Sequence, residues 1–284
     1  MKVIDIHTHA FPDEIAALAI RKLQDKAHIH PFTNGTRQNL ASSMRAAGIG
    51  LSVLQPVATS PRQVVHINDA AMRSNERWRE TGILSFGAMH PDFEGWREEL
   101  ARVARAGLKG IKLHPPYQGV DSDDPRNLRV LNRAGELGLI VLIHAGWDPG
   151  FPGGAQALPA KILRAIRSAG PATLILGHMG GWRCWDEAED LLGGTGTYID
   201  TSSALGAMTP NGDGHYRTEE LTLLDEEAFL RILRRWGADR VLFGSDSPWR
   251  GQDESLQSIN ALPLTEAERE AVLHGNAARL LGVS

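Results

Sequence analysis

Length, composition and charge indicate a folded globular protein. The chain has 284 residues, of which 42% are hydrophobic and 23% charged, so it can bury a sizeable core and resembles neither a disordered chain nor a membrane-embedded one. Its formal net charge of −4 and its mixed charge signs leave no basic stripe for nucleic acid and no polybasic anchor for a lipid surface, so we expect neither partner.

Short β-rich runs alternate with helix-patterned segments along the whole chain, and most of the runs are continuously apolar, as in parallel strands covered on both faces. The predicted strands are Lys2–Ile6, Leu51–Pro56, Ile83–Ala88, Gly110–His114, Leu139–His144, Thr173–His178, Thr197–Thr201 and Arg240–Ser245. The predicted helices are Asp13–Lys26, Leu40–Ala47, Pro61–Glu80, Phe93–Ala106, Pro125–Leu137, Ala157–Ser168, Trp185–Leu192, Asp225–Trp236 and Thr265–Leu281. Eight such units without a long linker favour a closed (β/α)8 TIM barrel over an open doubly wound sheet, in one domain over residues 1–284.

Metal-binding side chains gather where these strands end. His7 and His9 lie two residues apart, so in an extended strand both side chains leave the same face. The ends of later strands carry His114, His144, His178 and Asp246. Catalytic residues of a TIM barrel lie at the C-terminal ends of its strands. Imidazole and carboxylate groups that converge there suit a divalent ion such as zinc, which lowers the pKa of a bound water.

Longer motifs extend this pattern over essentially the whole chain. They are Gly110-Ile-Lys-Leu-His-Pro-Pro-Tyr-Gln118, Leu176-Gly-His-Met-Gly-Gly181, Tyr198-Ile-Asp-Thr-Ser202, Phe243-Gly-Ser-Asp-Ser-Pro-Trp249 and Gly275-Asn-Ala-Ala-Arg-Leu-Leu281. Together with the paired histidines, this set resembles the amidohydrolase superfamily of metal-dependent barrel enzymes. The resemblance is closest to the branch that contains aminocarboxymuconate-semialdehyde decarboxylase.

This resemblance implies a set of metal ligands and a catalytic residue. One divalent ion, with zinc as the first choice, would be held by His7, His9, His144 and Asp246. His178 would stand beside the ion as the group that takes or polarises a proton, a role that in general accelerates a reaction by about two to four orders of magnitude. For Asp246 two roles stay open, since it could bind the ion and could also orient a catalytic water.

Lys112 is the main ambiguity of the predicted site. It lies two residues before His114, so both side chains point inward if the strand is regular. Some amidohydrolases carboxylate a lysine on this strand and use it to bridge two ions. We favour a single ion and an unmodified Lys112 that pairs with Asp5 or Asp200, or with a substrate carboxylate, because buried lysines are usually paired. For His114 a place in the substrate site and a bond to a loop carbonyl both stay open.

Tryptophans and arginines follow several of the strands. They are Trp147, Trp182, Trp185, Trp249, Arg62, Arg183 and Arg250. Tryptophan at the active face favours a flat, partly apolar pocket for a ring or a conjugated acid, and core packing under long loops is the alternative. Each arginine could neutralise a substrate carboxylate, although a surface position is the commoner one. We take Trp147 and Arg250, with Lys112 and His114, as the predicted substrate contacts.

The predicted function is that of a metal-dependent enzyme for a small carboxylated or cyclic molecule. Hydrolysis by a metal-activated water is the first choice, and non-oxidative decarboxylation is the close alternative, because the same one-metal site serves both reactions in the family. A barrel DNase would carry a glutamate where this chain has Lys112-Leu-His114, and a catalytically silent metal-binding barrel would not need His178. The single cysteine, Cys184, and the lack of a signal-peptide apolar region favour the cytoplasm, while the sequence leaves a homodimer open.

Overall fold

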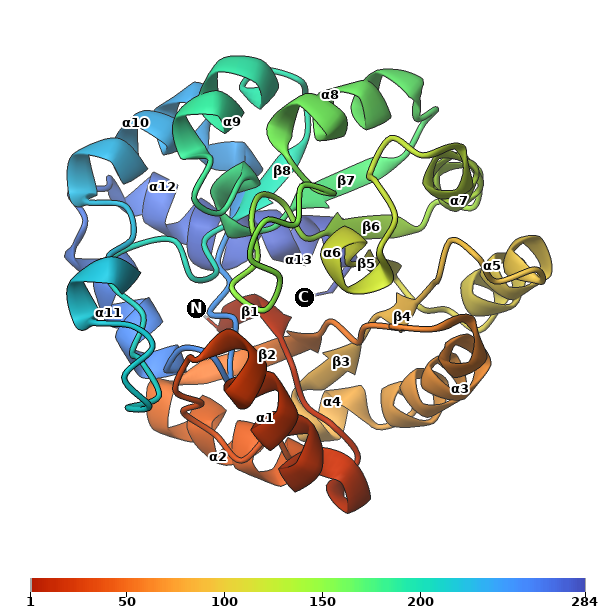
Figure 1. Ribbon diagram of the computed structural model, residues 1–284, viewed down its shortest axis with the longest axis horizontal. Coiled ribbons are helices and arrows are strands. Elements are labelled where there is room, and N and C mark those ends of the chain that lie inside the picture. The colour runs from red at the N-terminus through yellow and green to blue at the C-terminus, as the bar shows by residue number, and fades with distance from the viewer. Residues whose placement is uncertain (1, 284) are drawn as a thin grey trace.

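The strands form a ring that is surrounded by helices (Figure 1). The structure, a computed structural model, describes residues 2–283. Its strands are β1 Val3–Thr8, β2 Ile49–Leu54, β3 Ile83–Ser85, β4 Gly87–Ala88, β5 Gly110–Leu113, β6 Ile140–Ile143, β7 Thr173–Leu176, β8 Tyr198–Asp200 and β9 Val241–Leu242. All of the pairings between these strands are parallel and join elements that are consecutive in the chain. This architecture confirms the predicted TIM barrel.

Two junctions complete the ring. Only Phe86 separates β3 from β4, and its amide donates to a carbonyl of β2 at 3.0 Å, so the two segments continue one strand. At the other junction the amide of Ile6 donates to the carbonyl of Phe243 at 2.9 Å, and the amide of Asp246 donates to the carbonyl of His7 at 2.8 Å. The first and last strands are therefore neighbours. This brings the sequence motifs at the ends of these two strands together.

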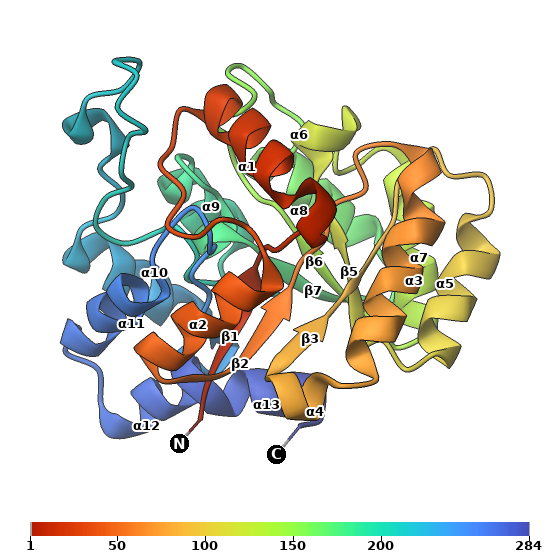
Figure 2. The same cartoon turned by 90° about the horizontal axis from the view of Figure 1, so that it is seen from below.

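Helices surround the ring and cover its two ends (Figure 1 and Figure 2). They are α1 Asp13–Ala27, α2 Arg37–Ala47, α3 Val64–Asn75, α4 Trp78–Thr81, α5 Trp96–Arg105, α6 Pro115–Gln118, α7 Pro125–Glu136, α8 Pro159–Ser168, α9 Trp185–Leu192, α10 Glu226–Trp236, α11 Gln252–Ala261, α12 Glu266–Glu270 and α13 Asn276–Leu281. A π-helical turn, Ala271–Gly275, joins the last two. Among the helices within residues 2–283, none is long and apolar enough to cross a membrane.

The predicted helix Pro61–Glu80 is divided in the structure. A 3-10 turn at Pro61–Gln63 precedes α3, which ends at Asn75. The Asn75 amide group accepts from the amide of Ser85 at 2.7 Å and donates to its carbonyl at 2.8 Å. This contact ties the end of α3 to β3, so tertiary bonding sets a boundary that helical periodicity does not reveal. The helix α11 was not predicted, because its residues show little of the apolar periodicity on which the prediction rested.

The two ends of the barrel differ in polarity. At the N-terminal end of the strands, a buried apolar cluster combines residues of β1, β2, β3, β6, β7 and β9 with Ala277 and Leu281 of α13. Figure 2 shows α13 at this end, near both termini, and α1 and α6 at the opposite end. The C-terminal ends of the strands are left to polar side chains, which is where the predicted site residues lie.

The close packing of β5 against β6 at Gly110 can be tested by mutation. A Cβ atom on Gly110 would lie 2.4 Å from the carbonyl oxygen of Ile140 and 2.6 Å from a ring carbon of Phe86. We expect Gly110→Ala to lower the free energy of unfolding by about 3 kcal/mol in urea denaturation, because the backbone must shift. Gly119→Ala is the control: its Cβ meets nothing within 4 Å, and only its positive φ of 65° opposes the change, by about 1 kcal/mol. Equal losses in the two variants would contradict this account.

Candidate metal centre and active site

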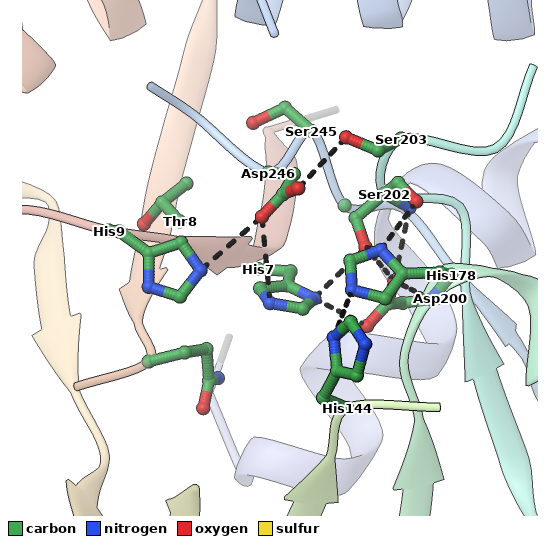
Figure 3. Close-up of polar contacts among 12 residues, drawn as sticks. His7, Thr8, His9, His144, His178, Asp200, Ser202, Ser203, Ser245 and Asp246 are labelled. Carbon is green, nitrogen blue, oxygen red and sulfur yellow. Dashed lines mark hydrogen bonds and ion pairs between the residues drawn. The ribbon is translucent and has the colours of Figure 1, made fainter. Parts of the chain in front are cut away.

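Three side chains from the joined ends of the barrel form a cluster of potential metal ligands. The ligand atoms of His7, His9 and Asp246 all lie within 4.8 Å of one another. Nε2 of His9 is 3.3 Å from Oδ1 of Asp246, and Nε2 of His7 is 3.8 Å from the same oxygen. Figure 3 shows the three converging, with His178 and His144 beside them. The two histidines of the first strand thus point into one space, as their spacing predicted.

Asp200, at the end of β8, holds His7 in place. Its Oδ2 lies 2.9 Å from Nδ1 of His7, while its Oδ1 accepts the backbone amides of His178 and Ser202 at 3.1 and 3.0 Å. Burial acts to raise the pKa of Asp200, but His7 and these bonds lower it below its ordinary value. With Nδ1 of His7 donating to this carboxylate, its Nε2 lone pair is turned toward Asp246. A carboxylate behind a ligating histidine is the usual support of a metal site.

Lys112 contacts His7 instead of its predicted carboxylate partners. Its Nζ lies 3.1 Å from Nε2 of His7, and the residue is only 1% exposed. Burial lowers the pKa of Lys112 to about 8, against the opposing effect of Asp200 and Asp246. The Lys112 ammonium lies on the Nε2 lone pair of His7. A metal ion would need the same lone pair, so the ammonium and the ion cannot bind this nitrogen together.

The carboxylates proposed for Lys112 are engaged elsewhere. Within the described residues neither Asp5 nor Asp200 lies within 4 Å of the Lys112 amine, since the ion pairs of that range do not include it. Asp5 accepts from the Ser245 hydroxyl at 2.6 Å and from the Gln252 amide at 2.8 Å. Asp200 is held by His7. The predicted lysine–carboxylate pair is therefore replaced by a lysine–imidazole contact.

His178 and His144 form an imidazole pair next to the cluster. Nε2 of His178 is 3.1 Å from Nδ1 of His144, whose Nε2 is 2.9 Å from the carbonyl of Trp147. That carbonyl can only accept, so Nε2 of His144 carries a proton. Burial, His178 and Lys112 lower the pKa of His144 well below its ordinary value, so its ring is neutral and its Nδ1 can only accept. His144, a predicted ligand, thus faces His178 rather than the His7–His9–Asp246 cluster.

Two of these residues have left-handed backbone conformations. His178 has φ 59° and Asp246 has φ 71°, although neither is a glycine. Such conformations cost of order 1 kcal/mol each and persist where the surrounding structure requires them, which is common at active sites. At both positions the backbone leaves its strand sharply, and the side chain is turned toward His7.

A second cluster lies on the other side of His144. The ring of His114 stacks on that of His144 with centroids 4.2 Å apart, and Nε2 of His114 is 3.5 Å from Oδ2 of Asp148. Burial raises the pKa of Asp148 to about 7. The sequence did not lead us to Asp148, and it suggested Asp200 only as a partner of Lys112. Both could have been found from the sequence as site residues, since each is a carboxylate at or just after the end of a strand.

Two predicted substrate contacts are used differently in the structure. The buried guanidinium of Arg250 donates to the carbonyl of Leu205 and, at 3.2 Å, to the Ser258 hydroxyl, which are the bonds of a structural side chain. The Trp147 side chain belongs to an apolar cluster under the long loops, together with Trp182, Trp185 and Trp249. For these tryptophans the structure favours core packing, the alternative that the sequence had left open.

The residues of the first cluster fit a divalent metal ion. Two imidazoles and one carboxylate, with a fourth position left for water or substrate, are the donor set of catalytic zinc and of other first-row metals. Burial and the Lys112 charge lower the pKa of His7 to about 4, so its imidazole is neutral at neutral pH, as metal ligation requires. Burial acts to raise the pKa of Asp246, but the hydrogen bond from His9 and the nearby imidazoles lower it below its ordinary value. Asp246 is therefore ionised, as a metal ligand must be.

The whole chain matches one family. The family model described as Amidohydrolase matches residues 4–283. The chain therefore belongs to the amidohydrolase family, which confirms the membership predicted from its motifs. Metal dependence is supported by this membership and by the His7–His9–Asp246 donor set. A search of curated proteins finds no match.

Solved structures share the fold over nearly their full length. A 2,6-dihydroxybenzoate decarboxylase from Rhizobium is 20% identical with a TM-score of 0.67, and 99% of each chain is covered. A 5-carboxyvanillate decarboxylase from Novosphingobium aromaticivorans with bound manganese is 16% identical with a TM-score of 0.65, covering 99% of this chain and 97% of that one. A protein from Pseudomonas putida, provisionally assigned as a 2-pyrone-4,6-dicarboxylic acid hydrolase, is 20% identical with a TM-score of 0.64 and the same coverage.

The support of His7 by Asp200 predicts a loss of metal affinity on its removal. In Asp200→Asn the His7 ring loses the charge that fixes its orientation, so we expect zinc affinity to fall about 10- to 100-fold in a chelator competition assay. Asp190→Asn, an exposed position on α9, is the matched control and should retain the wild-type affinity. Unchanged affinity in Asp200→Asn would show that the carboxylate does not support a metal ligand.

Proposed function

We propose that the protein is a metal-dependent hydrolase of a small carboxylated or cyclic substrate. The observation that carries this proposal is the position of His178 beside the His7–His9–Asp246 cluster, with Nδ1 anchored by Ser202 and Nε2 facing His144. Nδ1 of His178 lies 3.0 Å from the Ser202 hydroxyl and 3.0 Å from the Ser202 carbonyl oxygen. The carbonyl can only accept, so Nδ1 of His178 donates to it, whereas the Ser202 hydroxyl donates its proton to Asp200.

The proposed metal is one zinc ion held by His7, His9 and Asp246. An ion there would polarise the substrate and acidify a water molecule. His144 remains a proposed ligand that would have to turn away from His178, and Lys112 is proposed to stay an unmodified amine. The manganese in the 5-carboxyvanillate decarboxylase makes manganese the alternative metal.

The proton chemistry falls to the imidazole pair. His178 would take a proton at Nε2, the ring nitrogen that is not bonded to Ser202, as a nucleophilic water attacks, and the Ser202 carbonyl at Nδ1 would stabilise the imidazolium. The Nδ1 hydrogen bond to the Ser202 carbonyl keeps the ring oriented during this exchange. The same proton can later be given to the leaving group, so His178 serves as base and then as acid.

Decarboxylation of a carboxylated ring is the second candidate. The 2,6-dihydroxybenzoate and 5-carboxyvanillate decarboxylases favour it by their shared fold, and Lys112 supplies a buried cation near the cluster. Against it, Arg250 is bonded to Leu205, and Arg183 donates to the Glu220 carbonyl. Neither arginine is therefore positioned in this structure to hold a departing carboxylate.

The two reactions differ in what the product contains. We expect the zinc-loaded protein to hydrolyse 2-pyrone-4,6-dicarboxylate or a related lactone or amide, with incorporation of one oxygen from ¹⁸O-labelled water measured by mass spectrometry. Release of CO₂ from 2,6-dihydroxybenzoate or 5-carboxyvanillate, with solvent deuterium entering the ring, would instead establish the lyase. Carbon dioxide release without hydrolysis of any substrate in this panel would overturn the first choice.

Metal retention and turnover separate the roles of His7 and His178. We expect His7→Ala to lose most of its bound metal in elemental analysis, because one ligand of a small set is gone. In His178→Asn the metal should remain while turnover falls at least about a hundredfold. His66→Asn, on the exposed face of α3, controls for the loss of an imidazole. Loss of the metal together with His178 would make this residue a ligand and point to a two-metal site.

A further inference from the structure

An open cleft on the outside of the barrel is lined by four arginines. It lies between α2 and the segment that runs from the end of α3 through α4, and it has a volume of about 470 Å³. Figure 2 shows α2 and α4 beside β2 and β3, away from the loops at the C-terminal end of the strands. The arginines are Arg37, Arg45, Arg73 and Arg77, and Glu80 is the one carboxylate among the lining residues. The cleft is thus distinct from the metal centre.

Most of this positive charge is not neutralised. Arg77 pairs with Glu80 at 2.9 Å. Arg37 donates to the Ser74 hydroxyl and Arg45 to the Ser42 hydroxyl, which are neutral acceptors. Within residues 2–283, none of the ion pairs within 4 Å involves Arg37, Arg45 or Arg73. Three guanidinium groups therefore share one cleft without a carboxylate in contact.

Such a concentration of one charge is unusual in this chain. The formal net charge of the protein is −4, so an excess of positive charge over the whole chain does not explain this basic patch. Partial burial lowers the pKa of Arg37, and the charge of Asp13 only partly offsets this. Like charges that are brought together in a partly desolvated cleft are stabilised when an anion binds between them.

We infer that this cleft binds a small multivalent oxyanion, of the chemical class of phosphorylated metabolites. Guanidinium groups offer planar pairs of donors that match phosphate oxygens, and several guanidinium groups suit an anion with more than one negative charge. The volume lies in the range of small-molecule sites and is too small for a folded partner. This binding goes beyond the proposed reaction, since no residue of the cleft belongs to the metal centre.

Pyrophosphate binding tests the inference on the metal-loaded protein. Calorimetry should detect binding to the wild type, and the double variant Arg45→Gln/Arg73→Gln should bind at least about tenfold more weakly, the usual effect of losing a hydrogen bond to a charged group. Both residues are exposed, so the variant should keep the wild-type melting temperature. Arg97→Gln/Arg105→Gln on α5 is the matched control, because it removes the same charge from exposed positions outside the cleft and should bind as the wild type does.

Three outcomes would overturn the inference. Equal weakening in both double variants would mean that net charge alone attracts the anion. Unchanged affinity in the cleft variant would place pyrophosphate at the metal centre or elsewhere, and absence of binding to the wild type would remove the site. Citrate serves as the comparison ligand: cleft-dependent binding of pyrophosphate but not of citrate supports the phosphate class, whereas the reverse preference would contradict it.

Discussion

The contact between the first and last strands of the barrel is the constraint on which the site depends. At this junction the backbone carbonyl of His7 accepts the amide of Asp246, and Ile6 bonds to Phe243. These bonds bring His7 of β1, and His9 just after it, to the carboxylate that follows β9. Since the proposed ligands are supplied by opposite ends of the chain, the proposed metal centre can form only in the closed barrel. Metal binding and closure should stabilise each other, because an ion bound only by the folded form favours that form.

His7 is the residue through which the other polar groups of the site are connected. Its Nδ1 is held by Asp200, its Nε2 faces Lys112 and Asp246, and its ring lies 5.1 Å from that of His178. Lys112 and the two carboxylates share this buried space, so their charges largely offset one another. An arriving cation would meet a neutral imidazole and an ionised carboxylate, but it must displace the lysine amine. The site therefore attracts a metal ion, while the Lys112 amine competes with that ion for His7.

The imidazoles form a continuous row, from His9 through His7 and His178 to His144 and His114, with rings between 4.2 and 5.2 Å apart. At one end of the row, His9 and His7 are the proposed metal ligands. At the other end, His114 faces Asp148. Burial keeps the far end neutral, so a proton gained at His178 has no charged imidazole to oppose it there. This arrangement suits an enzyme that must accept a proton and return it, which both hydrolysis and decarboxylation require. The choice between them rests on the substrate and not on this row.

The sequence by itself determined the barrel, the family and the strand ends that carry chemistry, because apolar runs and turn residues report local structure and the His7/His9 spacing reports a shared face. It could not determine which of these polar groups touch. Lys112 was expected on Asp5, Asp200 or a substrate carboxylate and lies on His7. Arg250 was expected at a substrate and is bonded to Leu205 and Ser258, while Trp147, also expected there, packs against an apolar cluster. Asp148 was not selected, and Asp200 was considered only as a partner of Lys112. These differences have one physical cause. A side chain's partner depends on the position of groups 24 to 247 residues away in the chain, and only the closed tertiary structure sets those distances.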